Sequence, residues 1–142
     1  MSVKSVQFSV AAHILATLGF HHGEEVSSAT LAESVNADPT FVRKSLSKLS
    51  KAGLVVTKRG KSGSATLARA PRKITLLDVY RASGAPPALA IHSYRVAPRC
   101  PVSTSLKPCL SDLLSKAQNS FEKSLAKTTV ADLVRDIRQR KR

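Results

Sequence analysis

Basic side chains without acidic neighbours are the groups in this chain best suited to bind a partner. The segment from Pro39 to Lys73 contains no Asp or Glu. Lysine and arginine neutralise phosphates and release the counterions condensed on nucleic acids, so such a segment favours a polyanionic partner. The net charge of +14 over 142 residues points to the same class of partner. The basic residues of the segment are Arg43, Lys44, Lys48, Lys51, Lys58, Arg59, Lys61, Arg69, Arg72 and Lys73.

The first part of this segment has the pattern of a helix with one charged face. Asp38 is a typical N-cap residue, and Pro39 suits the first helical position. Val42, Leu46 and Leu49 recur at i, i+4 and i+7, a spacing that turns one face toward a core. This apolar content also separates the segment from a disordered tail. The side chains predicted to face outward and to contact DNA are Thr40, Arg43, Lys44, Ser47, Lys48 and Lys51.

Flanking elements complete a DNA-binding architecture. Helical spacing predicts a first helix from Val3 to Phe20 and a second over residues 28–35, with Ser28 as its N-cap. The short turn between the second helix and the basic helix makes the pair a helix-turn-helix. Two short strands are expected at residues 54–57 and 65–67, joined by a glycine-containing loop that forms a wing. The basic wing residues predicted to contact DNA are Lys58, Arg59 and Lys61.

These elements, taken in order, resemble the Rrf-two family of bacterial winged-helix transcription regulators. The resemblance covers nearly the whole chain, through residues 28–35, 39–55, 59–63, 67–69, 74–82, 100–102 and 126–133. The family includes the iron–sulfur cluster regulator, the nitric-oxide-sensitive repressor and a repressor of cysteine metabolism. The resemblance therefore implies a dimeric regulator that acts on double-stranded DNA as a repressor. The wing departs from the family pattern, since Gly63, Ser64 and Ala65 follow where a further glycine and a bulky residue are common.

The two cysteines bear on cofactors and redox chemistry. Family members that bind a [2Fe–2S] cluster carry three closely spaced cysteines, whereas this chain has only Cys100 and Cys109. The spacing of the four histidines, at positions 13, 21, 22 and 92, does not indicate further ligands. We therefore expect no metal and no cofactor; an iron–sulfur cluster is the alternative, which the missing third cysteine disfavours. Cys100 is a candidate redox thiol, because it precedes Pro101 where the positive end of a helix stabilises a thiolate. Cys109 is the second candidate, and a packed, inert thiol is the alternative at both positions.

A long apolar stripe near the C-terminus predicts a helix that needs a partner. Its residues recur at spacings of three and four. Pairing with the same helix of a second chain would make a homodimer, and folding back on the first helix is the alternative. Pro108 is expected to start or kink the helix. The predicted interface consists of Leu106, Leu110, Leu113, Leu114, Ala117, Phe121 and Leu125.

The sequence thus predicts a mostly α fold with a small β-wing: a winged helix-turn-helix domain plus a long C-terminal dimerisation helix. The expected parts are a DNA-binding domain at residues 1–83, a sensor-type loop at 84–101, and at 102–142 the dimerisation helix, a terminal helix over 129–137 and a solvated basic tail. The expected function is sequence-specific binding to a palindromic operator. A protein-interaction module and a general nucleic-acid-binding basic protein are the alternatives. No catalytic pattern and no apolar stretch long enough to cross a bilayer is present, so we expect a cytoplasmic non-enzyme.

Overall fold

A computed structural model describes residues 5–58 and 63–140 of the chain. Arg59 and Lys61, two of the predicted wing contacts, lie outside this description. The chain divides into two compact units, the first formed by residues 1–85 together with 125–142, and the second by residues 86–124. The mostly α fold with a small β-wing is confirmed. Among the described residues, no helix is both long enough and apolar enough to cross a membrane.

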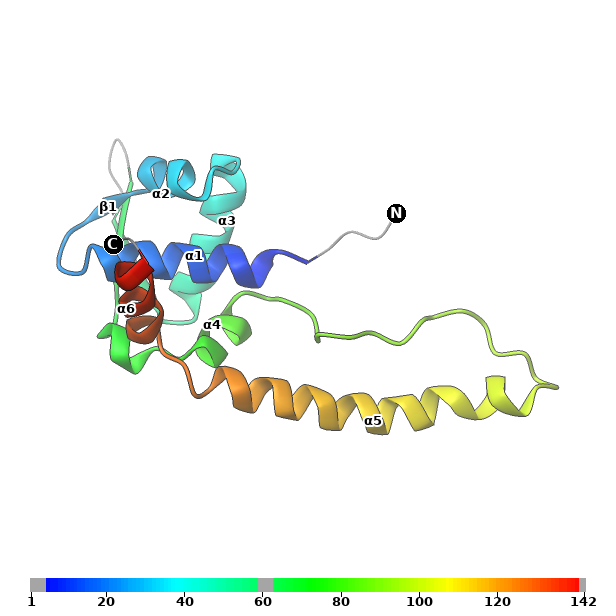
Figure 1. Cartoon of the computed structure of the whole chain (residues 1–142). Helices are drawn as coiled ribbons and strands as arrows, with labels where there is room; N and C mark the ends of the chain where they lie inside the picture. The colour runs from blue at the N-terminus through cyan, green and yellow to red at the C-terminus, as the bar shows by residue number, and fades with distance from the viewer. Residues whose placement is uncertain (1–4, 59–62, 141–142) are drawn as a thin grey trace. The chain divides into compact units, whose positions relative to one another are not determined.

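A helix-turn-helix packed on the N-terminal helix forms the first part of the first unit (Figure 1). The three helices are α1 (Gln7–Phe20), α2 (Ser28–Val35) and α3 (Pro39–Lys51). Ser27, not Ser28 as predicted, caps α2, because its hydroxyl accepts from the Thr30 N–H at 3.0 Å. Asp38 caps α3 as predicted, accepting from the Thr40 N–H at 2.8 Å. Asn36 ends α2 with a φ of 61°, and this left-handed residue makes the sharp turn into α3.

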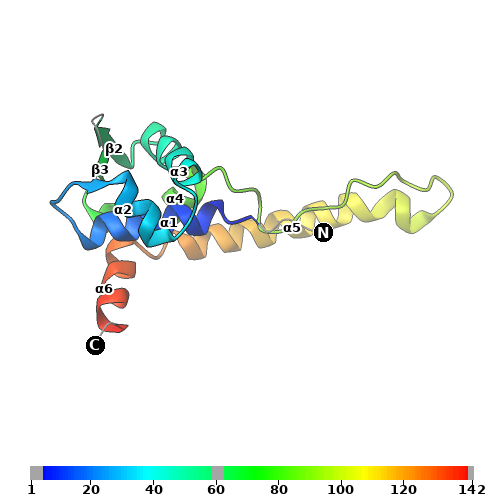
Figure 2. The same ribbon diagram turned by 90° about the horizontal axis from the view of Figure 1, so that it is seen from above.

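The wing is part of a three-stranded antiparallel sheet in the order β1-β3-β2. The strands are β1 (Val26–Ser27), β2 (Val55–Lys58) and β3 (Ser64–Leu67), and β2 contacts α3 (Figure 2). In the register of the sheet, β3 pairs with both neighbours, since Ser64 lies opposite Ser27 on one side and Lys58 on the other. Sequence reasoning missed β1, because two residues are too few to show a strand period.

The core of the first unit is aliphatic and draws on helices from both the N-terminal and the C-terminal parts of that unit. Val42, Leu46 and Leu49 are buried as predicted, which turns the opposite face of α3 outward. Val130 and Val134, from the C-terminal segment at residues 125–142, complete this core, so the core forms only when that segment packs on the rest of the unit. The largest fully buried side chains are Ile14, Leu15, Leu18, Leu31, Leu49, Leu54, Ile74, Val42, Val79 and Val130.

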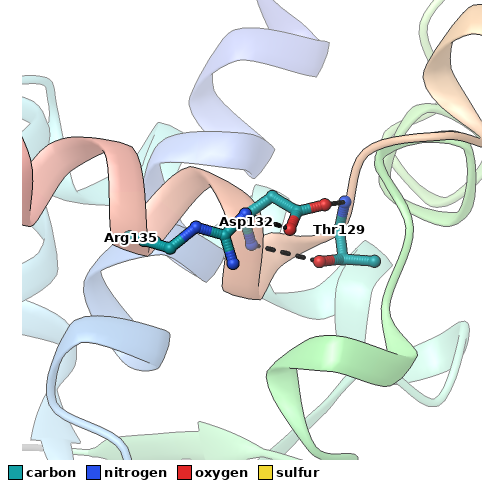
Figure 3. Close-up of polar contacts among 3 residues, drawn as sticks. All are labelled: Thr129, Asp132 and Arg135. Carbon is teal, nitrogen blue, oxygen red and sulfur yellow. Dashed lines mark hydrogen bonds and ion pairs between the residues drawn. The ribbon is translucent and has the colours of Figure 1, made fainter.

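Two helices, α4 (Leu76–Ala82) and α6 (Val130–Arg140), begin side by side at an antiparallel bridge between Thr75 and Thr129. A short 3-10 helix, η1 (Pro71–Lys73), precedes α4. Each helix starts with a capping box, in which a Thr hydroxyl and an Asp carboxylate three residues later each accept from the other residue's N–H. Figure 3 shows the α6 pair, Thr129 and Asp132, with the Arg135 guanidinium donating to the same carboxylate at 2.7 Å.

The sequence predicts that the C-terminal basic residues form a solvated tail, but two of them belong to a helix. Arg138 and Arg140 lie within α6, which continues beyond the predicted end at Ile137. The Arg138 guanidinium stacks on the Phe20 ring, 4.3 Å from its centroid, and donates to the Phe20 carbonyl at 2.9 Å. Arg138 therefore anchors α6 to the end of α1. Lys141 and Arg142 lie outside the described residues.

The second unit contains most of α5 (Pro101–Leu125) and the extended segment that precedes it. Pro108 lies inside the helix, and helical structure begins seven residues before it, so this proline does not start α5. The segment runs back along α5 and is tied to it by hydrogen bonds such as the one from Lys107 Nζ to the Tyr94 carbonyl at 2.7 Å. None of the described side chains of α5 is buried.

Candidate nucleic-acid interface

A broad groove of about 1200 Å³ lies between the helix-turn-helix and the wing strands. One wall is formed by α2 and α3, and the other by residues at the facing ends of β2 and β3. Its width is maintained at one end by a hydrogen bond from the Ser28 N–H to the Gly63 carbonyl at 3.2 Å, with Gly63 in the left-handed region at a φ of 52°. The groove is lined by Ser28, Ala29, Ala32, Glu33, Asn36, Ala37, Pro39, Arg43, Leu46, Ser47, Ser50, Lys51, Thr57, Lys58, Gly63 and Ser64.

The structure brings four of the predicted DNA-binding residues together in this groove. Arg43, Ser47 and Lys51 come from the exposed face of α3, and Lys58 comes from the end of β2. Three are cationic and one is a small hydrogen-bonding residue, which is the combination that contacts phosphates and base edges. Helix α3 has 13 residues and is about 20 Å long, and such a helix fits the major groove of B-DNA.

The remaining predicted residues lie at other positions. Thr40 and Lys44 are exposed on α3 but do not line the groove. Lys48 lies on the flank of α3, and its ammonium approaches the Ser83 carbonyl just after α4, at 3.5 Å. This contact connects α3 to the C-terminal end of α4. The DNA contacts assigned to Thr40, Lys44 and Lys48 stay predictions.

Acidic residues reach the basic surface only through tertiary folding. Glu33 lines the groove from α2, and Glu25, just before β1, forms an ion pair with Lys58. The hydrogen bond from Lys58, followed by the charge of its ammonium, lowers the pKa of the Glu25 carboxyl. The same pair raises the pKa of Lys58. Sequence reasoning missed Glu25 because it lies 33 residues from Lys58 and next to a strand that was not predicted.

The two cysteines lie on the second unit and are both free and exposed. Neither thiol is buried within a single chain, and whether each is a redox thiol or a packed, inert one stays a prediction. The Cys100 carbonyl accepts from the Thr104 N–H at 3.0 Å, and its sulfur accepts from the Ser103 N–H at 3.5 Å, so Cys100 is the N-cap of α5. Cys109 is nine residues further along the helix, which places the two Cα atoms about 13 Å apart.

These residues do not fit an iron–sulfur cluster of the type held by three close cysteines. A cluster needs four protein ligands, and the two sulfurs are separated by more than two helical turns. Within residues 5–58 and 63–140, no three His, Cys, Asp or Glu side chains are grouped so that they would hold a metal ion. His13 contacts Ser34 at 2.9 Å, and His92 lies against Tyr94. That the protein works without a cofactor stays a prediction.

Comparison with known proteins identifies the family. Residues 4–136 match the Rrf2 family model, described as iron-dependent transcriptional regulator. The HTH-type transcriptional regulator YwnA of Bacillus subtilis (strain 168) is 33% identical over 132 residues, covering 92% of this chain and 96% of that protein.

Two solved structures share both the fold and some sequence identity. A transcriptional regulator from Lactobacillus plantarum has a TM-score of 0.78 at 29% identity, covering 94% of this chain and 90% of that one. T. potens IscR has a TM-score of 0.66 at 26% identity, covering 96% and 88%. These relatives are described as regulators rather than enzymes. The groove, the helix-turn-helix and these matches agree, and the chain belongs to the Rrf2 family of DNA-binding transcription regulators.

Proposed function

We propose that the groove between α3 and the wing is the DNA-binding surface. One observation carries the proposal: Arg43, Ser47 and Lys51 converge with Lys58 on one concave face, although the wing residue comes from a different element. In this arrangement α3 lies in the major groove, and the wing follows the neighbouring backbone. Arg43 and Ser47 read base edges. An Arg side chain makes two parallel hydrogen bonds to guanine, and a Ser hydroxyl can donate to or accept from a base edge. Lys51 and Lys58 neutralise phosphates.

We further propose that the protein binds as a homodimer through α5. A helix of 25 residues with none buried has no hydrophobic driving force of its own to stay folded. Its stripe leaves large apolar side chains in water, with Leu106 38% and Leu113 60% exposed. A second copy of α5 would cover these side chains. Two-fold symmetry then presents two α3 helices to half-sites about one helical turn apart, which makes the operator palindromic.

Repression follows from this mode of binding when the operator overlaps a promoter, because a bound dimer excludes the polymerase. The bacterial chromosome lies in the cytoplasm, and we place the protein there for the same reason. A redox signal, if the protein receives one, would enter through the exposed Cys100 at the start of α5.

Selection of bound duplexes from a random pool, followed by affinity measurements at several salt concentrations, tests the proposal. We expect one palindrome to be preferred by at least about 1000-fold over mixed sequence at physiological salt. Arg43→Ala should cost about 1 to 3 kcal/mol on that palindrome and relax preference at one base pair per half-site. Lys51→Ala should weaken all sequences alike.

Lys127→Ala is the matched control, since it removes the same charge from an exposed position that does not line the groove. If Lys127→Ala and Lys51→Ala weakened DNA affinity equally, the interaction would be a general charge attraction, as expected of a nonspecific basic protein. Unchanged operator affinity in an Arg43→Ala, Lys51→Ala, Lys58→Ala triple variant would refute the proposed surface and would favour a protein partner.

A further inference from the structure

The basic segment at residues 39–73 has no acidic residue of its own, but folding brings the Glu25 carboxylate against its Lys58. Lys58, at the end of β2, and Glu25, just before β1, belong to opposite edges of the sheet, and Ser64 of β3 lies between them in register with Lys58. The Glu25 carboxylate accepts a hydrogen bond from the Lys58 ammonium, and the Ser64 side chain contributes slightly to the lowered pKa of that carboxyl. Lys58 and Ser64 both line the proposed DNA groove. A carboxylate therefore already accepts from the ammonium that the proposed DNA contact requires.

We propose that Glu25 competes with DNA phosphate for Lys58 and so sets the affinity of the wing for DNA. This inference rests on the proposed function. The ion pair is exposed, with 69% of the Lys58 side chain and 49% of the Glu25 side chain accessible, and exposed pairs are weak because water and salt screen them. A phosphate has access to Lys58, but only with the like-charged carboxylate beside it. The Glu25–Lys58 pair carries no net charge, so Lys58 neutralises a phosphate and releases counterions only to the extent that its ammonium leaves Glu25.

Replacing Glu25 by Gln should free Lys58 to make a full phosphate contact. Since Lys58 contacts the backbone and not a base, a labelled duplex of mixed sequence and about 25 bp is a sufficient probe. Fluorescence anisotropy from about 50 to 200 mM salt should show a steeper salt dependence for Glu25→Gln than for wild type, by about 0.9 in the log–log slope. Over that range the variant should lose about 3.5-fold more affinity than wild type loses, starting from tighter binding at low salt.

Glu24→Gln is the matched control. Glu24 is the adjacent residue, has the same charge and contacts His21 at 3.7 Å, and it does not line the groove. We expect Glu24→Gln to change the salt slope little. A second substitution then separates release of Lys58 from simple loss of negative charge. Lys58→Met should cost more affinity in the Glu25→Gln background, where it should abolish the gain, than in the wild-type and Glu24→Gln backgrounds.

Equal slopes for Glu25→Gln and Glu24→Gln, or an equal cost of Lys58→Met in all three backgrounds, would overturn the inference while leaving DNA binding intact. An absence of duplex binding by wild type at the lowest salt would instead overturn the proposed function. An NMR titration of the Glu25 carboxyl tests the pair without DNA, and its pKa should rise toward the ordinary value in Lys58→Met. An unchanged pKa would show that the pair is not formed and would refute the inference by itself.

Discussion

Thr75 and Thr129 are partners in one antiparallel bridge, and each also caps the helix that follows it. The bridge is framed by hydrogen bonds from the Leu76 N–H to the Thr128 carbonyl and from the Val130 N–H to the Ile74 carbonyl, both at 2.8 Å. Ile74 and Val130 are fully buried next to it. The chain leaves the first unit at Ala85 and returns to it at Leu125, and this bridge closes the unit just before α6 begins.

Removing the cap of α6 should therefore destabilise the first unit. We expect Thr129→Ala to lower the free energy of unfolding by about 1 kcal/mol, the usual cost of losing an N-cap hydroxyl, as measured by urea denaturation followed by circular dichroism. Thr75→Ala should act similarly on α4. Thr128→Ala is the control, because it keeps the backbone carbonyl that accepts from Leu76 and is not a cap. An equal loss in Thr128→Ala would show that the effect does not come from the cap.

The α6 capping box should also make stability depend on acid pH. The Thr129 N–H, followed by the Arg135 guanidinium, holds the pKa of Asp132 below its ordinary value of 3.8. A carboxyl with a lowered folded-state pKa stabilises the fold above its unfolded-state pKa and loses this contribution as the pH falls through the folded-state pKa. Glu25, whose pKa is also lowered, acts in the same direction.

Asp132→Asn removes that contribution, so its melting temperature should fall less steeply than that of wild type as the pH decreases from about 5 to 3. Asp112→Asn, at an exposed position on α5, makes the same change of charge and serves as the control. Parallel melting curves for wild type and Asp132→Asn across this window would contradict the prediction.

Close packing between α1 and α6 should require glycine at position 19. A Cβ there would lie 3.0 Å from Val134 Cγ2 and 3.2 Å from Val130 Cγ1. Alanine favours a helix by up to about 1 kcal/mol over glycine, but overpacking a core costs about 1 to 3 kcal/mol. We expect Gly19→Ala to destabilise the protein by about 1 kcal/mol net. In a Val134→Ala background the same change should be neutral or stabilising, and an equal cost in both backgrounds would argue against the steric explanation.

The proposed dimer can be tested with two variants of α5, one that places a charge in the apolar stripe and one that places it on another side of the helix. Leu113→Lys places an unpaired ammonium in the apolar stripe, which costs several kcal/mol if the stripe is buried between two chains. Sedimentation velocity should then detect monomer or aggregate. Ser115→Lys adds the same charge to an exposed position two residues along, on another side of the helix, and should leave the dimer intact. A Leu113→Lys dimer as tight as wild type would place the interface elsewhere.

Oxidation should act on each thiol separately. Intact α5 holds the Cα atoms of Cys100 and Cys109 about 13 Å apart, whereas a disulfide needs about 4.4 to 6.8 Å, so no disulfide should form within one chain. Cys100→Ser keeps a capping side chain at the start of α5, and Cys109→Ser is the control. If Cys100 transmits a signal, peroxide should weaken operator binding in wild type and Cys109→Ser but not in Cys100→Ser. Identical responses in all three proteins would remove Cys100 from any redox response.

Local sequence determined α3, the helix of the proposed DNA-binding surface. Asp38 and Pro39 fix where α3 begins, and the spacing of Val42, Leu46 and Leu49 fixes which face is buried. The outward positions of Arg43 and Ser47 follow from those same few residues. They were predictable because capping and helical periodicity act over one to three turns. The apolar stripe of α5 could be read for the same reason, although what covers it could not.

Tertiary structure decided everything that joins distant parts of the chain. Strand β1 exists only because β3 pairs with it, and it carries Glu25 to Lys58 across a sheet. Arg138, which the sequence placed in a solvated tail, stacks on Phe20, 118 residues away. Such contacts depend on where the buried aliphatic core brings the backbone, and no period or cap in the local sequence encodes that position, because burial of apolar surface is not directional.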